Sequence, residues 1–280
     1  MRDFTITQYN ARRKVLLKQC VQCKTLCGFL ESANRKVAIL RIDVDDLPNK
    51  SLHVAKIQNE LGRKSTFYFR AVPWNWDEGI IQQIAELGHE VGYHYEDVSS
   101  VAERQKIKVK RQKDNPENEC EKYLAGLAIE SFAKNLERLR KIVPVKTICM
   151  HGSPLSRWDS RLLWKYYDYH DFGIVGEPYF DVNFDEVFYI TDTGRRWDGD
   201  QFNLRDKAVG SRRWAEGEEK KGRFHSTFDI IKAAEEGKLP DKIMMTFHPQ
   251  RWTDKPVPWV KELVWQNVKN VGKLFLVKIR

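Results

Sequence analysis

The polarity pattern of the chain alternates between short apolar runs and longer amphipathic segments. Apolar runs of strand length lie at 36–44, 65–70, 89–94, 146–151, 171–175, 186–191 and 242–248. Between these runs, apolar residues recur at helical spacing, as at 80–87 and again from Leu124 to Val143. Strands that alternate with helices are typical of a parallel sheet or a (β/α) barrel. The pattern therefore predicts an α/β fold.

The length of the chain and its lack of internal repeats predict a single domain over residues 1–280. With 280 residues and 41% hydrophobic content, the chain can bury a large core. Polar residues interrupt every apolar run in 1–35, so we expect a helical extension there rather than a signal peptide, and a cytoplasmic location. The polar segment 178–225, which contains several Gly and Trp residues, is expected to be an inserted loop over the rim of the sheet.

The amino-terminal cysteines raise the question of a second metal site. In an amphipathic helix Cys20, Cys23 and Cys27 would share one face, and their spacing matches no common zinc pattern, so we expect structural thiols. Disulfides are not expected in a cytoplasmic chain. The 48 basic and 39 acidic residues give a net charge of +9, scattered along the chain without a nucleic-acid motif. No nucleic-acid partner is therefore expected.

Polar side chains gather where four of the predicted strands end. The residues at these ends are Asp43, Asp45, Asp46, His94, His151 and His248. Because the carboxyl ends of parallel strands meet at one rim, and barrel enzymes place their chemistry there, we expect these side chains to converge. Carboxylates and imidazoles together are a ligand set for zinc. The sequence therefore predicts a hydrolytic metal site.

Three segments at these strand ends resemble the polysaccharide deacetylase family (NodB-homology, carbohydrate esterase family 4), as a divergent branch. The segments "LRIDVDD", "GHEVGYH" and "TFHPQRW" carry the resemblance, which covers roughly residues 36–151 and returns at 242–252, while "CMHGSP" departs from the family pattern. The resemblance implies a NodB-like, distorted (β/α) barrel of about seven parallel strands, with an inserted loop region over its carboxyl-terminal rim.

The first motif of the family supplies a general base and a metal ligand, both aspartates. Here the resemblance implies Asp43 as the base and Asp45 as the ligand, since side chains two positions apart on a strand share a face. The adjacent pair, with Asp45 as the base and Asp46 as the ligand, matches the commoner form of the motif. Both assignments stay open from the sequence.

The second motif of the family carries two histidine ligands four positions apart. His94 takes the first place, but Val98 stands in the second and cannot bind a metal. Asp97, one position short, or His151, at the end of the next strand, could supply the missing ligand. We favour His151, because Gly152 and Ser153 directly after it would let a substrate approach the backbone closely.

The last motif of the family implies His248 as the general acid. The pocket around the motifs is expected to bind substrate through residues of the rim and of the inserted loop: Asp46, Asp97, Asp192, Arg196, Trp197, Arg251 and Trp252. His89 precedes the second motif within its strand and is expected to serve structure.

The resemblance implies a hydrolase that removes an N-acyl group from an amino sugar with the help of a divalent metal, zinc above all. A cytoplasmic chain would act on a lipid-linked or nucleotide-linked precursor of a cell-surface polysaccharide rather than on an external polymer. Two alternatives stay open because of Val98: an allantoinase-like hydrolase of cyclic amides, and a non-catalytic carbohydrate-binding protein with the same fold.

The carboxyl-terminal segment has a further pattern. One face of a helix there would carry Trp259, Leu263, Val264, Val268, Val271 and Phe275, with lysines around it. We expect this face to pack on the barrel, and peripheral contact with a membrane is the alternative. The sequence does not set an oligomeric state.

Overall fold

A parallel sheet forms the centre of the computed structural model, which describes residues 2–10, 22–32, 36–105, 117–152, 156, 158–197 and 224–279. Seven strands pair in the order β5-β4-β3-β2-β7-β6, with β1 beside the first half of β2. Their bounds are β1 Gln22–Lys24, β2 Val37–Val44, β3 Thr66–Phe69, β4 Glu90–Tyr95, β5 Ile148–Met150, β6 Phe188–Thr191 and β7 Lys242–Phe247. The predicted α/β fold with about seven parallel strands is confirmed.

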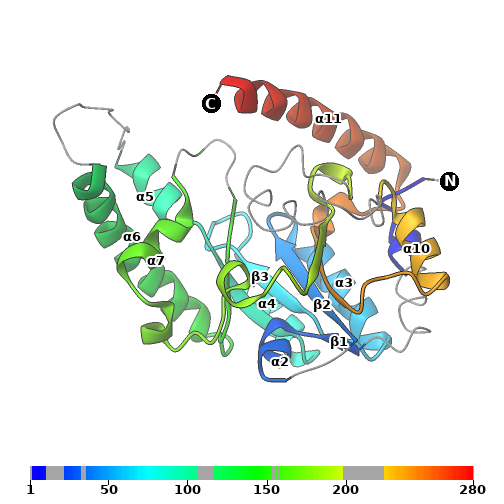
Figure 1. Cartoon of the computed structure of the whole chain (residues 1–280), viewed down its shortest axis with the longest axis horizontal. Coiled ribbons are helices and arrows are strands. Elements are labelled where there is room, and N and C mark those ends of the chain that lie inside the picture. Colours follow the sequence, from blue (N-terminus) through cyan, green and yellow to red (C-terminus); the bar gives the residue numbers. More distant parts are fainter. Residues whose placement is uncertain are drawn as a thin grey trace.

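Helices surround this sheet (Figure 1). The longer ones are α3 Pro48–Glu60, α4 Glu78–Glu86, α5 Asp97–Arg104, α6 Glu117–Arg140, α10 Thr227–Glu235 and α11 Pro256–Ile279. The shorter ones are α2 Leu26–Leu30, α7 Leu163–Tyr166 and α8 Pro178–Asp181, with 3₁₀ turns η1 Ser160–Leu162, η2 Tyr169–Phe172, η3 Thr193–Arg195 and η5 Pro249–Arg251. Helices α4 and α6 confirm the amphipathic segments predicted from the spacing. Among the described helices, none is long and apolar enough to cross a membrane.

The central strand β2 is buried along its whole length and divides the core into two parts. Its residues Ala38, Leu40 and Ile42 belong to the larger hydrophobic cluster, whereas Ile39 belongs to a smaller one with Tyr68 and other residues. Because side chains alternate along a strand, Arg41 and Asp43 lie on the same side as Ile39. The face with the smaller cluster therefore leads to the polar rim.

One predicted strand is absent from the described part of the structure. Residues 171–175 were expected to form a strand, but the turn η2 Tyr169–Phe172 takes their place, with an isolated bridge from Thr147 to Gly176. The Asp168 side chain caps this turn, and Gly173 ends it in the left-handed region at φ 67°. A local cap and a glycine stop therefore outweigh the apolar character of the run.

The amino-terminal region is only partly helical. Residues 6–10 and α2 are helical, but Cys23 lies in strand β1, next to the Arg63 guanidinium, while Cys27 lies in α2. The two thiols therefore do not share one helix, which corrects that expectation, and Cys20 lies outside the described residues. The part of the predicted rim loop over 198–223 also lies outside them, whereas 178–197 contains α8, β6 and η3.

Candidate metal centre

Five side chains from four strands of the sheet meet at its carboxyl edge. Asp43 lies in β2 and Asp45 just beyond it, His94 lies in β4, and His151 and His248 follow β5 and β7. The Nε2 atoms of the three histidines each lie 3.6 Å from a carboxylate oxygen of Asp45. The Nε2 atom of His94 also lies 3.6 Å from Oδ2 of Asp43. The structure thus brings together all five residues to which the sequence assigned chemistry.

Each imidazole is oriented through its other nitrogen. Nδ1 of His94 lies 2.8 Å from the backbone carbonyl oxygen of Cys149. Nδ1 of His151 lies 3.0 Å from a carboxylate oxygen of Glu96, and Nδ1 of His248 lies 2.5 Å from one of Asp192. A partner at one ring nitrogen fixes the orientation of the ring, as is usual for metal-binding and catalytic histidines. The Nε2 atoms therefore all point toward Asp45.

Arginines stand behind three of the carboxylates. The Arg41 guanidinium donates two hydrogen bonds to Asp43, of 2.7 and 2.6 Å, and Arg70 donates two of 2.9 Å to Glu96. Nη1 of Arg251 lies 2.9 Å from Oδ1 of Asp192. The sequence analysis missed Arg41, Arg70 and Glu96.

A usable signal existed for Arg41, which stands two positions before Asp43 and so shares its face of the strand. Arg41 thus contacts Asp43 from within the same strand.

The charges of these groups perturb the pKa values of the site. Burial alone would raise the pKa of Asp43, but Arg41, followed by His94 and His248, lowers it below its ordinary value. Burial would also raise the pKa of Asp45, yet the neighbouring histidines, led by His151, lower it strongly. Burial lowers the pKa of His94 to about 4, against the opposing effect of Asp43. Both carboxylates are therefore charged and His94 is neutral near pH 7, as metal ligation requires.

The surroundings of one carboxylate oxygen of Asp45 indicate that the site suits a cation. Oδ1 of Asp45 is buried and has no hydrogen-bond partner among the described residues. It lies 3.6 Å from Nε2 of His94 and 3.6 Å from Nε2 of His151. A buried carboxylate oxygen without a donor is costly, and a cation with two imidazole ligands would satisfy it. Asp45, His94 and His151, whose ligand atoms lie within 4.8 Å of one another, fit a divalent metal.

A second potential ligand group shares His94. It combines Asp43, His94 and Cys149, a residue that the sequence analysis did not consider. Cys149 lies opposite His94 in the pairing of β4 with β5, which brings the two side chains to the same side of the sheet. Since Asp43 is already held by two hydrogen bonds from Arg41, the group around Asp45 is the better candidate.

Asp97 and His151, the two residues that could replace the missing histidine at Val98, have different surroundings. Val98 is fully buried in the larger hydrophobic cluster. The carboxylate of Asp97 accepts hydrogen bonds from Tyr93, Ser131 and Asn135, of 2.7 to 2.8 Å, and is buried among them. Its placement is that of a structural residue rather than a ligand or a substrate contact, whereas His151 lies beside Asp45.

The predicted substrate contacts divide into buried and exposed residues. Asp192 and Arg251 are buried and support His248, while the indole N–H of Trp252 donates a 2.7 Å hydrogen bond to Asp192. Trp197 stacks with Phe4 in the core, at a ring separation of 6.1 Å. These buried residues support the site from behind.

Asp46 and Arg196 remain exposed, and Asp46 accepts a 2.8 Å hydrogen bond from the backbone N–H of Leu47. Asp46 therefore does not join Asp45 in the cluster, which favours the alternating pair Asp43 and Asp45. Gln250, which sequence analysis also missed, places its amide nitrogen 3.4 Å from Oδ2 of Asp45. His89 is buried and lies 2.9 Å from the carbonyl oxygen of Ala55, away from the cluster.

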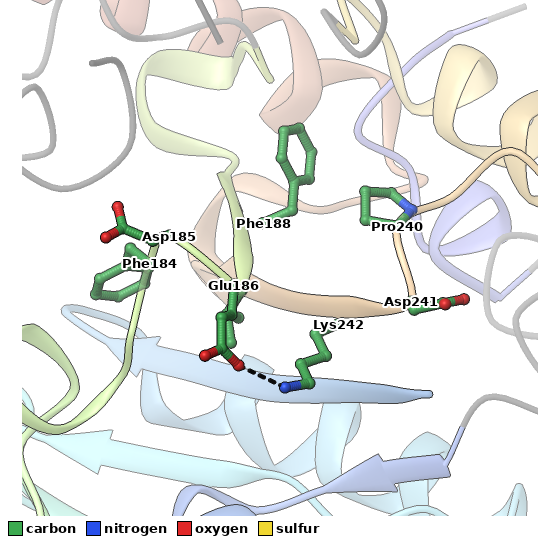
Figure 2. A pocket seen from close by; sticks show the side chains of 8 residues that line it. Phe184, Asp185, Glu186, Phe188, Pro240, Asp241 and Lys242 are labelled. Atoms are coloured by element: carbon green, nitrogen blue, oxygen red, sulfur yellow. Dashed lines mark hydrogen bonds and ion pairs between the residues drawn. The ribbon is translucent and has the colours of Figure 1, made fainter. Parts of the chain in front are cut away.

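A pocket lies at the opposite edge of the sheet, where β6 and β7 begin (Figure 2). Its lining consists of Phe184, Asp185, Glu186, Val187, Phe188, Pro240, Asp241 and Lys242. The ion pair of Glu186 with Lys242, 2.6 Å long, crosses its wall. Because His248 lies at the other end of β7, this pocket is separate from the candidate metal centre.

Comparison with known proteins gives matches among solved structures. No family model matches the chain, and no curated protein matches it. The structure is similar to a CE4 family pseudoenzyme from Bacillus anthracis, BA3943, at 13% identity and a TM-score of 0.42, covering 86% of this chain and 63% of that one. A mutant of BA3943, described as having restored enzymatic activity, matches at 13% identity and a TM-score of 0.42, covering 86% of this chain and 65% of that one.

A further match is the Xyl-CE4 domain of a multidomain xylanase from the hindgut metagenome of Trinervitermes trinervoides. Its identity is 13% and its TM-score 0.39, and the match covers 85% of each chain. These neighbours are described as members of the family that the sequence resembles, which agrees with the predicted resemblance. At such identities and TM-scores the likeness carries no argument about activity, which depends on the site itself.

Proposed function

We propose that the chain is a metal-dependent hydrolase that removes an N-acyl group from an amino sugar. The observation that supports this best is the buried, unsatisfied oxygen of Asp45 between two imidazole nitrogens. Asp43 and His248 flank this position, with the Nε2 atom of His248 3.9 Å from Oδ2 of Asp43. A ligand set beside a carboxylate base and an imidazole acid is what amide hydrolysis needs.

Asp45, His94 and His151 would hold the cation. A bound divalent cation lowers the pKa of water and polarises a carbonyl group. Asp43 is charged near pH 7 and fixed by Arg41, so it accepts the proton of the attacking water. His248, fixed by Asp192, donates a proton to the leaving amine. A backbone N–H at Tyr95 or Gly152 would donate a hydrogen bond to the oxyanion.

We propose an N-acylated sugar carried on a lipid or a nucleotide as the substrate. The resemblance of the strand-end motifs supports the sugar, and the net charge of +9 favours a carrier that contains phosphate. The same site would release a free amino group and a short carboxylate.

The experiment is a measurement of bound metal in the purified protein by elemental mass spectrometry. We expect near-stoichiometric zinc or another divalent metal in the wild type, and its loss in His94→Ala and in His151→Ala. His170→Ala, at an exposed histidine away from the site, is the matched control and should keep the metal. The metal-loaded protein is then assayed for release of carboxylate from N-acyl amino sugars.

Two outcomes would contradict the proposal. If the wild type holds no metal and Val98→His gains it, the missing histidine has disabled the site, and carbohydrate binding without catalysis becomes the better function. If the wild type holds metal but hydrolyses cyclic amides instead of N-acyl sugars, the allantoinase-like function replaces the proposed one.

A further inference from the structure

Helix α11 has its polarity reversed relative to an ordinary surface helix. Gln266 and Asn270 are buried, at 3% and 6% exposure. The opposite face is apolar and exposed by 51% to 77%, through Val257, Val260, Val264, Trp265, Val268 and Val271. We call these six residues the outer face of α11. The sequence analysis expected an apolar face of this helix to pack on the barrel, and the structure corrects this for Val264, Val268 and Val271.

Polar contacts hold α11 in this orientation. The amide of Asn270 donates a 3.0 Å hydrogen bond to the carbonyl oxygen of Gly194 in η3, and accepts one of 3.0 Å from Gln266. The indole N–H of Trp259 donates a 2.6 Å hydrogen bond to the carbonyl oxygen of Asp3. Rolling the helix to bury its valines would break these bonds, so its outer face stays on the surface. Figure 1 shows α11 at the periphery of the molecule.

The charges beside the outer face are positive. Lys255, Lys261 and Lys269 are exposed, and the amino group of Lys269 lies 5.7 Å from the ring centre of Trp265. Glu262 is half-buried, and no acidic residue follows it in the sequence. An apolar stripe with a tryptophan and flanking lysines is the composition of helices that lie at the surface of an anionic bilayer.

We propose that α11 docks on an anionic lipid bilayer through its outer face. A second copy of the chain is the less suitable occupant, because it would bring lysines against lysines without exposed carboxylates on this helix to pair with them. The anionic lipid headgroups pair with the lysines, which have no exposed acidic partner on this helix. The six side chains of the outer face enter the boundary of the acyl region. This docking goes beyond the proposed hydrolysis and does not depend on it.

Co-sedimentation of the full-length protein with lipid vesicles tests the docking. The vesicles contain phosphatidylcholine alone or phosphatidylcholine mixed with phosphatidylserine. We expect binding to the mixed vesicles, and at least tenfold weaker binding for the double variant Val264→Glu/Val268→Glu. Val175→Glu, at an exposed valine outside α11, is the matched control and should bind like the wild type.

Circular dichroism and metal content of the same samples show whether each variant is folded and whether its metal centre is intact, so that failure of docking is distinguishable from failure of the proposed hydrolase. The inference is overturned if the wild type binds neither kind of vesicle, if it binds both equally, or if the double variant binds like the wild type. A wild-type dimer that the double variant converts to a monomer, without vesicle binding, would assign the outer face to a second copy instead.

Discussion

Asp43, within β2, and Asp45, just after it, have different partners, which suits them to different roles in the proposed hydrolysis. Asp43 is held by Arg41 through two hydrogen bonds, whereas Oδ1 of Asp45 is buried without a donor among the described residues. A base needs a fixed position and a charge, while a ligand needs an oxygen that is free to bind the metal.

Substituting each aspartate by asparagine separates these roles. Asp45→Asn should lose the metal, because a neutral amide is a poor ligand for zinc. Asp43→Asn should keep the metal and lower the rate of hydrolysis by about 10²- to 10⁴-fold, the usual contribution of a general base. Metal content and initial rates check both, and equal metal loss in the two variants would count against the division.

A carboxylate oxygen of Glu96 lies 3.0 Å from Nδ1 of His151, but Glu96 is not itself one of the proposed metal ligands. Glu96→Ala should weaken metal binding by about 10- to 100-fold, since the imidazole loses the partner that orients it. Glu103→Ala, at an exposed glutamate of α5, is the control and should not change the affinity. Competition with a chelator measures both, and an unchanged affinity in Glu96→Ala would mean that His151 is not a ligand.

The site residues that could be predicted from sequence are those whose position on a strand determines where their side chains lie on the sheet. Asp43, Asp45, His94 and His248 fall at strand ends, and parallel pairing then brings them together. Asp192 and Trp252 were expected to contact substrate but support His248 from behind, because side-chain burial depends on tertiary packing that a single sequence does not show. Glu96 was missed because its arginine and histidine partners are distant in sequence.

At the scale of helices and strands, the buried side chain of Glu177 links β5 to α8. One of its carboxylate oxygens accepts a 3.0 Å hydrogen bond from the backbone N–H of Met150 in β5, and the other accepts one of 2.5 Å from Tyr179 at the start of α8. Burial, which outweighs these hydrogen bonds, raises the pKa of Glu177 to about 7. The folded protein therefore binds a proton at Glu177 more tightly than the unfolded chain does.

This proton makes stability depend on pH. Between the ordinary pKa of 4.5 and the raised value of about 7, the folded state holds more protons, so the free energy of unfolding should fall as pH rises. The contribution of one such group is at most about 1.4 kcal/mol per pH unit. Urea unfolding across this range should show a flatter dependence in Glu177→Gln. Glu130→Gln, at an exposed residue of α6, should follow the wild type.

The elements themselves were predicted where length and periodicity agree, as in α4, α6 and β7. Among the described residues 171–175 no strand forms, because Phe172 and Ile174 pack into the core from a turn, and the side chain of Asp168 with the left-handed Gly173 sets that turn. Strand β1 was missed because its three residues carry too short a pattern to be distinguished from a helix.

Across the whole chain, the first residues pack against the last third. Phe4 is buried between Trp197 and Trp252, at ring separations of 6.1 and 5.1 Å, and its carbonyl oxygen accepts a 3.2 Å hydrogen bond from the N–H of Thr253. Because Trp252 also holds Asp192, this contact supports the segment behind His248.

Removing this ring should therefore be costly. Phe4→Ala should lower the free energy of unfolding by about 3 to 5 kcal/mol, the usual effect of truncating a buried aromatic residue. Urea unfolding measures the change, and Tyr123→Ala, at a tyrosine with 64% exposure, is the control that should change it little. A small effect of Phe4→Ala would mean that the amino-terminal segment is not integral to the fold.

The three arginine–carboxylate pairs determine the net charge of the candidate metal centre. Asp43, Glu96 and Asp192 each face a guanidinium, so their formal charges cancel and Asp45 leaves the cluster with one negative charge. With the imidazoles neutral, a monovalent cation would bring this sum to zero and a divalent cation would bring it to +1, and the proton that His248 carries as the proposed acid would add one charge in either case. A divalent ion would therefore leave the larger positive potential for the negative charge that develops on an amide oxygen under attack.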